Sequence, residues 1–161
     1  MAVSTTHAVL FVCLGNICRS PLAQGVLEDA VAKANVPVLV DSAGTSTYHI
    51  GEPPDSRGIR CAKGHGIDTS GQRARQVKRS DFADFDLVIA MDASNLDDMK
   101  SRWAKTDEER AKLRMLMDYV PDDERTDVPD CWYADDPEES FEDVYSVFVK
   151  AAPAILSDLG L

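Results

Sequence analysis

The chain has 161 residues, of which 44% are hydrophobic and 28% are charged, and its formal net charge is −11 at pH 7. This length allows one domain with a substantial core over residues 1–161 and is too short for two domains of ordinary size. The acidic balance argues against nucleic-acid binding, because a phosphate backbone needs a basic surface.

The first predicted element is a strand that ends at a tight loop. The apolar run at 8–12 favours a strand buried on both faces of a parallel sheet. Gly15 and Asn16 tolerate the backbone angles of a tight loop. Ser20 is the expected N-cap of a helix with Pro21 at its first position. Apolar residues then follow at helical spacing, at Leu22, Val26, Leu27, Ala30 and Val31.

Strands and helices alternate along the rest of the chain, which favours an α/β fold with a doubly wound parallel sheet. In chain order we expect a strand at 36–40, a helix at 54–63, a strand at 87–91, a helix at 94–103 and a short strand at 113–117. A last helix is predicted from an apolar stripe formed by Phe141, Val144, Tyr145, Phe148, Ala152 and Ile155. Pro153 should kink or restart that helix.

The beginning of the chain and its cysteines bear on its compartment. It has no basic n-region, and its apolar run is far shorter than the roughly 20 residues of a membrane span, so we expect neither secretion nor a membrane anchor. The four cysteines lack the pair spacing of a zinc site and do not form a disulfide scaffold. We therefore expect a cytoplasmic protein without a bound metal.

Charge is distributed unevenly. Twelve acidic residues and one basic residue, Arg125, lie between Asp118 and Asp143. A basic segment at 72–79 holds Arg73, Arg75, Lys78 and Arg79. Four charges in a surface segment usually form a solvated face, and their functional alternative is the steering of anionic peptides.

The loop after the first strand is predicted to bind a phosphate dianion. It reads Cys13-Leu14-Gly15-Asn16-Ile17-Cys18-Arg19-Ser20-Pro21. Backbone amides at 14–19 and the positive end of the helix would surround the dianion. Cys13 would lie beneath it, where the amides and the Arg19 guanidinium favour the nucleophilic thiolate. Arg19 has the planar fork that holds two phosphoryl oxygens, and Ser20 could donate a hydrogen bond to the sulfur.

A simpler interpretation makes Cys13 a buried, inert cysteine and Arg19 an exposed helix residue. Free cysteines are often of that kind. The upstream strand, the Gly-Asn pair and the Ser-Pro pair favour the phosphate-binding loop instead.

Four further segments of the chain match the sequence pattern of a known protein family. They are Asp41-Ser42-Ala43-Gly44-Thr45, Gly51-Glu52-Pro53-Pro54-Asp55, the run at 85–92, and Val128-Pro129-Asp130. With the Cys, five residues and Arg-Ser near the N-terminus, the chain resembles low-molecular-weight protein tyrosine phosphatases over nearly its whole length. The resemblance implies a four-stranded parallel sheet with helices on both faces. It also implies hydrolysis of phosphotyrosine in proteins, and of aryl phosphates, through a phosphocysteine intermediate without a cofactor. We expect a monomer or a weak dimer.

Departure of the phenol or alkoxide needs a general acid on the far side of the phosphorus from the nucleophile. Asp130 is the predicted acid because Val128-Pro129-Asp130 matches the family's acid loop, and because two aromatic residues follow it. Asp127 and Asp135 remain alternatives, although loop carboxylates of this kind are usually solvated. The family's loop commonly reads Asp-Pro-Tyr-Tyr, whereas Cys131 and Trp132 follow the aspartate here.

Other residues are expected to support the loop or to line a slot for the substrate. Asn16 should pin the loop, with Ser42 as its neighbour by resemblance, although a plain turn asparagine is an equal alternative. Tyr48, Trp132 and Tyr133 could form an aromatic slot that admits a phenyl phosphate and excludes phosphoserine. Tyr48 is assigned by resemblance, and its alternative is an exposed loop tyrosine. Family members that act on phosphoarginine carry Thr where this chain has Ile17.

Cys18 is expected to lie near Cys13 in any loop that wraps a phosphate. Its spacing and the resemblance predict a reversible disulfide that protects the nucleophile from overoxidation. Cys61 and Cys131 are interpreted as structural or incidental.

Three other functions compete with this prediction. A phosphoarginine phosphatase and a thiol-dependent arsenate reductase share the fold, but the reductase needs a relay of cysteines that Cys61 and Cys131 do not resemble. A non-catalytic phosphate-binding module would keep the loop and would need neither Cys13 nor Asp130.

Overall fold

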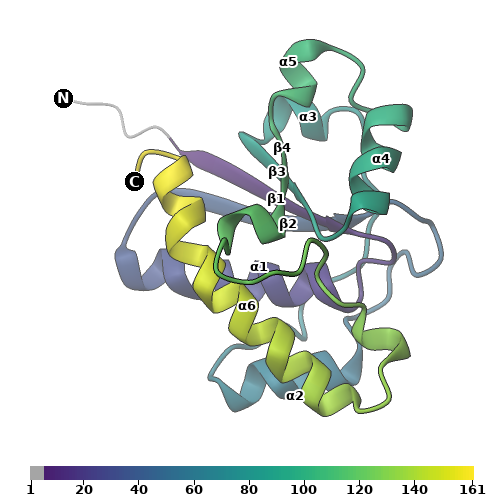
Figure 1. Ribbon diagram of the computed structural model, residues 1–161, viewed down its shortest axis with the longest axis vertical. Coiled ribbons are helices and arrows are strands. Elements are labelled where there is room, and N and C mark those ends of the chain that lie inside the picture. Colours follow the sequence, from purple (N-terminus) through teal and green to yellow (C-terminus); the bar gives the residue numbers. More distant parts are fainter. Residues whose placement is uncertain (1–5) are drawn as a thin grey trace.

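The computed structural model describes residues 6–161, which form a four-stranded parallel sheet in the order β2-β1-β3-β4, with helices on both faces (Figure 1). The elements are β1 (His7–Cys13), α1 (Arg19–Ala34), β2 (Val38–Gly44), α2 (Ser56–Gly64), α3 (Asp81–Asp84), β3 (Leu87–Ala90), α4 (Ala93–Arg102), α5 (Asp107–Arg110), β4 (Leu113–Met115), the 3-10 helices η1 (Leu116–Tyr119) and η2 (Cys131–Tyr133), and α6 (Pro137–Asp158). The predicted fold class is confirmed.

Strand β1 lies inside the sheet and is buried on both faces. Its side chains alternate between two cores, so that Phe11 faces one core and Leu10 faces the other. This explains why its sequence is continuously apolar rather than alternating.

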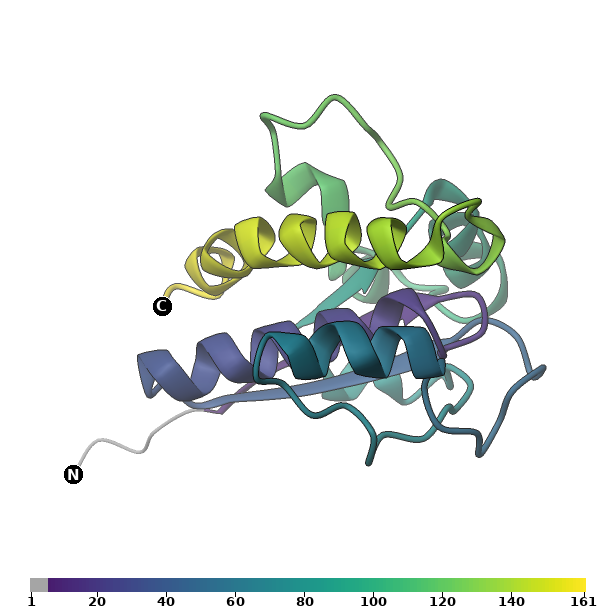
Figure 2. The same ribbon diagram turned by 90° about the horizontal axis from the view of Figure 1, so that it is seen from below.

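Each face of the sheet is covered by its own set of helices. Helices α1, α2 and α6 pack against one another on one face (Figure 2). Phe82 of α3 and Met99 of α4 belong to the core on the other face. The chain leaves β1 for β2 on one side and returns to β3 on the other. The carboxyl ends of β1 and β3 therefore flank the point at which strand order reverses, where open α/β sheets bind ligands.

Several boundaries differ from those expected. Strand β2 starts and ends later than the predicted strand at 36–40, because its whole length from Val38 to Gly44 pairs in register with β1. Strand β4 ends at Met115, after which the chain turns into η1.

Helix α6 runs unbroken through Pro153, so the predicted restart is wrong. Proline removes the hydrogen bond to the carbonyl four residues earlier, at Val149. Both residues lie on the exposed side of the helix, where water can replace that bond. Among residues 6–161, no helix is both long and apolar enough to cross a bilayer.

Candidate active site

The loop at 13–19 lies between the carboxyl end of β1 and the amino end of α1, as predicted. Cys13 is 3% exposed at the end of β1. Asn16 adopts a left-handed conformation with φ of 58°, which asparagine tolerates better than most residues. Its backbone N–H donates to Cys13 Sγ at 3.2 Å. The loop therefore curls around the sulfur and directs a backbone donor at it.

Asn16 ties the loop to three other segments. Its Nδ2 donates to Ser20 Oγ at 2.8 Å and to Ser42 Oγ at 2.9 Å. Its Oδ1 accepts from the backbone N–H of Arg75 at 3.0 Å. A fully bonded buried polar network of this kind holds a single conformation.

Ser20 does not cap the helix. Helix α1 begins at Arg19, and Cys18 occupies the N-cap without a capping side-chain hydrogen bond. Ser20 is instead fully buried, with its Oγ 3.0 Å from Cys13 Sγ. The hydroxyl serves the cysteine and Asn16, and so the capping prediction from the Ser-Pro pair is wrong.

Gly44, at the end of β2, lets a second backbone segment approach the loop. A Cβ atom built on it would lie 2.7 Å from the carbonyl oxygen of Leu14 and 3.2 Å from the backbone N of Asn16. No side chain fits there without moving the loop.

Arg19 is 4% exposed and is held at the pocket wall. Its Nη1 donates to Asp92 Oδ2 at 2.8 Å and to the carbonyl oxygen of Val128 at 3.1 Å. Burial alone would lower the pKa of the guanidinium, but the charge of Cys13 and the hydrogen bond that Arg19 donates to Asp92 raise it. The arginine is thus fixed in its charged form beside the sulfur.

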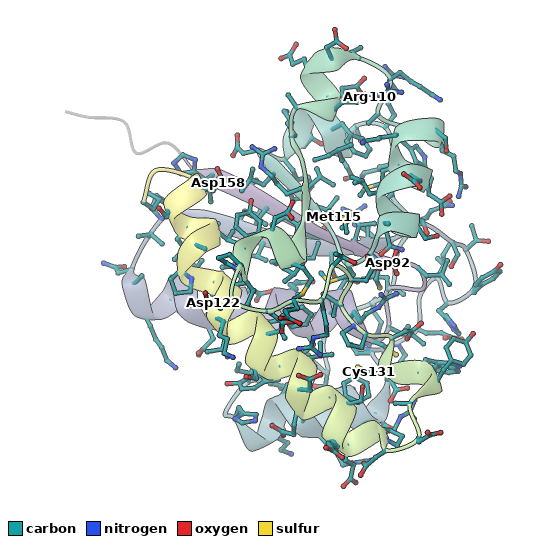
Figure 3. The ribbon with its side chains drawn as sticks, viewed as in Figure 1. Asp92, Arg110, Met115, Asp122, Cys131 and Asp158 are labelled. Atoms are coloured by element: carbon teal, nitrogen blue, oxygen red, sulfur yellow. The ribbon has the colours of Figure 1, made fainter. Side chains whose placement is uncertain are left out.

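Asp92 has two functions in the structure, and neither is predicted by the sequence patterns described above. Its Oδ1 caps α4 by accepting from the backbone N–H of Asn95 at 2.8 Å, and its Oδ2 holds Arg19. Figure 3 shows Asp92 on the same side of the molecule as Cys131, away from Asp158. The capping role could have been predicted from the sequence, because an aspartate three residues before Asn95 matches a capping box at the start of a helix.

We expect Asp92→Asn to lower kcat/KM by about tenfold to a hundredfold, since it keeps a cap acceptor but loses the charged partner of Arg19. The measurement is steady-state kinetics on an aryl phosphate, with a thermal melt to separate loss of stability. Asp97→Asn, an exposed aspartate of the same helix, is the matched control. Equal activity of the two variants would contradict the positioning role.

Asp130 lies next to Arg19 at the mouth of the same pocket. Its Oδ2 is 3.9 Å from Arg19 Nη2, and its side chain is 34% exposed. Its Oδ1 accepts from the backbone N–H of Trp132 at 3.0 Å. Of the three aspartates considered for the acid, only Asp130 lines the pocket, and Asp127 bonds the backbone N–H of Ala93 instead.

The pocket has Cys13 and the loop at its base and aromatic residues at its rim. Tyr48, Trp132 and Tyr133 are the three exposed aromatic residues expected there, and all three line it. The complete lining is Cys13, Leu14, Gly15, Ile17, Cys18, Arg19, Tyr48, His49, Asp130, Trp132 and Tyr133. The predicted nucleophile, acid and rim residues therefore share one cavity.

Two residues near the Trp132 ring were not predicted from the sequence, and of these only His49 lines the pocket. His49 lines the pocket, bonds Glu52 at 2.6 Å and lies 5.9 Å from the Trp132 ring. The guanidinium of Arg57, from α2, lies 5.7 Å from the centroid of that ring. The positions of His49 and Arg57 near Trp132 could not be read from spacing, because each of these two pairs joins segments far apart in the chain.

The acid loop carries Cys131 and Trp132 where the family commonly has Pro and Tyr, and the two side chains face opposite ways. Cys131 is fully buried and faces the core, whereas Trp132 and Tyr133 face solvent. Burial raises the pKa of the Cys131 thiol. Neither Cys131 nor Cys61 lines the pocket.

Comparison with known proteins agrees with this geometry. The family model described as low molecular weight phosphotyrosine protein phosphatase matches residues 8–160. The chain belongs to this family. The human low molecular weight phosphotyrosine protein phosphatase is 44% identical over 158 residues, which cover 97% of this chain and 98% of the human protein.

Solved structures of related phosphatases share the fold. The crystal structure of YfkJ from Bacillus subtilis superposes with a TM-score of 0.89 at 36% identity, covering 99% of this chain and 98% of that one. A Drosophila arginine phosphatase superposes with a TM-score of 0.87 at 31% identity, covering 95% and 98%. Proteins with this fold are thus named as phosphatases of more than one kind of substrate, phosphotyrosine in one case and arginine in the other.

Proposed function

We propose that the protein is a protein tyrosine phosphatase in which Cys13 is the nucleophile, Arg19 holds the phosphoryl group and Asp130 is the general acid. The observation that carries the proposal is the convergence on Cys13 Sγ of the Asn16 N–H at 3.2 Å and the Ser20 hydroxyl at 3.0 Å. Donors aimed at sulfur stabilise its thiolate, which is the reactive form.

In the first step, the Cys13 thiolate attacks phosphorus in line with the departing phenol oxygen. The sulfur–phosphorus bond forms as the phosphorus–oxygen bond breaks, and Asp130 donates a proton to the leaving oxygen. The amides at 14–19 and the Arg19 fork hold the equatorial oxygens. Such positioning and charge stabilisation account for most of the catalysis of phosphoryl transfer.

In the second step, the Asp130 carboxylate takes a proton from water as the water attacks the phosphocysteine. The sulfur–phosphorus bond breaks, phosphate leaves and the thiolate is restored. Ser20 Oγ, 3.0 Å from the sulfur, can donate a hydrogen bond to it as it departs. The reaction needs no metal or cofactor.

The rim favours an aromatic phosphate ester on a protein surface. Tyr48 and Tyr133 are 75% and 79% exposed, and Trp132 is 45% exposed, so that they extend from the mouth of the pocket. An aryl ring can lie between such side chains while its phosphate reaches the loop, whereas a serine side chain is too short. The substrate is thus a phosphotyrosine-containing protein.

Burst kinetics test the proposed function. Wild-type protein mixed with p-nitrophenyl phosphate should release about one equivalent of phenolate quickly and then turn over more slowly, because the phosphocysteine accumulates. Phosphotyrosine, phosphoserine and phosphoarginine peptides assayed in parallel should show a clear preference for phosphotyrosine. Tight phosphate binding without turnover would make the protein a phosphate-binding module instead.

Phosphoarginine is the second candidate substrate, because the fold matches that of an arginine phosphatase. Ile17 is 7% exposed and lines the same pocket as Cys13. Its apolar side chain offers no hydrogen bond to a guanidinium, which favours the phenyl ring. Faster hydrolysis of phosphoarginine in the peptide panel would reverse the assignment.

We also propose that Cys18 protects Cys13 from oxidation. Peroxide would convert the Cys13 thiolate to a sulfenic acid, and Cys18 would attack that sulfur, forming a disulfide and releasing water. Burial, and then the charge of Asp55, raise the pKa of the Cys18 thiol. Because attack requires its thiolate, trapping is expected to quicken about tenfold per pH unit while the pH stays below that pKa.

A Cys18→Ser variant is expected to recover a several-fold smaller fraction of activity than wild type when peroxide treatment is followed by a dithiol reductant. Without Cys18, the sulfenic acid continues to the sulfinic acid, which the dithiol does not reduce. Cys61→Ser is the matched control. Full recovery of Cys18→Ser would refute the protective role.

The redox state of the cysteines bears on the compartment in which the protein acts. All four cysteines are free thiols, as expected in a reducing compartment such as the cytoplasm. We propose that the protein acts there as a monomer or a weak dimer, in contact with neither nucleic acid nor membrane.

A further inference from the structure

Cys61, His65 and Glu142 form a cluster of three metal-ligating side chains outside the active-site pocket. Their ligand atoms all lie within 4.8 Å of one another. Cys61 Sγ donates to Glu142 Oε1 at 3.5 Å, and His65 Nε2 lies 2.7 Å from Glu142 Oε2. One carboxylate thus faces a thiol and an imidazole at the same time.

The packing of two helices creates the cluster. Cys61 lies in the last turns of α2, and His65, its C-cap, is one turn further on, so that both side chains point to the same side. Glu142 lies near the start of α6, which packs along α2 (Figure 2). Because Glu142 is 77 positions from His65 in sequence, the spacing of the cysteines alone gave no sign of this site.

The surroundings orient the ligands and leave the cluster accessible. Cys61 is 9% exposed, and the side chains of His65 and Glu142 are 34% and 54% exposed. The His65 ring stacks on Tyr145 with centroids 3.7 Å apart and planes 11° apart, which fixes the direction of Nε2. The thiol is therefore at the floor of the cluster, and the other two ligands are at its opening.

A groove leads to the cluster from solvent. It is lined by Arg57, Arg60, Cys61, Asp136, Glu138, Glu139 and Glu142. Four of these residues are acidic and two are basic, so a cation approaches a locally acidic surface.

We propose that Cys61, His65 and Glu142 bind a zinc ion that joins α2 to α6, with water as the fourth ligand. Thiolate, imidazole and carboxylate together are typical zinc ligands, and the thiolate disfavours magnesium and calcium. Tetrahedral zinc holds nitrogen and oxygen ligands about 3.4 Å apart. The Nε2–Oε2 separation of 2.7 Å must therefore widen by less than about 1 Å, within the reach of two partly exposed side chains. On binding, Cys61 releases its proton to solvent.

The test measures zinc affinity in a Cys13→Ser background, because the thiolate of Cys13 is itself a zinc ligand. Titration against a chromophoric chelator should give one zinc per chain. Cys61→Ser and His65→Gln should each weaken binding at least about 100-fold, and Glu142→Gln at least about tenfold. His49→Gln is the matched control, since His49 pairs with Glu52 at 2.6 Å without a nearby thiol, and it should leave the affinity unchanged.

Cobalt provides a spectroscopic readout. Co²⁺ added to the Cys13→Ser protein should give a thiolate charge-transfer band that is absent from the protein that also carries Cys61→Ser. Zinc should raise Tm in the first protein and not in the second, whereas magnesium and calcium should leave both unchanged.

No stoichiometric zinc, or zinc affinity unchanged by both Cys61→Ser and His65→Gln, would overturn the proposal. The cluster would then be a hydrogen-bonded link between the helices only. If Cys61→Ser fails to fold, His65→Gln gives the same decision from a more exposed position.

Discussion

Replacing Cys13 with serine is expected to reduce kcat on p-nitrophenyl phosphate at least about 10⁴-fold. A serine hydroxyl keeps its proton at neutral pH, and no base lies against it in the loop to remove that proton, whereas donors from Asn16 and Ser20 already converge on the sulfur. The measurement is burst and steady-state kinetics, in which both the burst and the slow phase should disappear.

The same variant should still bind phosphate, because the amides of the loop and the Arg19 side chain are unchanged. Calorimetry with inorganic phosphate separates loss of the nucleophile from collapse of the site. Cys61→Ser, assayed in metal-free buffer, should retain activity. A Cys13→Ser protein with more than a few per cent of wild-type activity would show that another group attacks phosphorus.

Asp130→Asn is expected to reduce kcat/KM, which reports the first step, on phosphotyrosine peptides about 10²- to 10³-fold, within the range of general acid catalysis. The amide oxygen of asparagine can still accept the hydrogen bond from the Trp132 N–H. The amide has no acidic proton that it could transfer to the leaving oxygen. Loss on p-nitrophenyl phosphate should be smaller, because nitrophenolate leaves without protonation. The measurement is kcat/KM across a series of phenyl phosphates whose leaving groups differ in acidity.

In that series, wild-type kcat/KM should depend weakly on the leaving group, and the kcat/KM of Asp130→Asn should depend strongly on it. Asp135→Asn, an exposed aspartate of the same acidic stretch, should resemble wild type. If Asp135→Asn or Asp127→Asn instead shows the steep dependence, the acid has been assigned to the wrong carboxylate.

The sequence predicted the parts of the site that are built locally. Strand, tight loop and helix at 7–34 follow from a short run of residues, and Asn16 in its left-handed conformation is the kind of residue that such a loop needs. The alternation of elements along the chain likewise predicted the parallel sheet. Resemblance to a family then placed Asp130 and the aromatic rim in the same cavity.

Contacts between distant segments were not predictable in this way. Asp92 reaches Arg19 from 73 positions away, and a capping aspartate looks the same whether or not an arginine lies opposite. Arg75 appeared to belong to a solvated basic segment. Its guanidinium instead pairs with Asp81, which is 1% exposed, and its backbone N–H bonds Asn16.

Ser20 shows the opposite error, in which a local pattern was correct for helices in general and wrong here. A serine before proline usually caps a helix, but the buried sulfur and Asn16 bond this hydroxyl. Competition from a tertiary partner decided its role.

The bonding of Asn16 to three segments has a consequence for inhibitor selectivity. A loop fixed by Ser20, Ser42 and the Arg75 backbone has little freedom to change shape between relatives, so a compound that only mimics phosphate should bind them similarly. Discrimination has to come from groups outside the loop. A selective compound would need to contact the Trp132 ring, which has the guanidinium of Arg57 5.7 Å from its centroid.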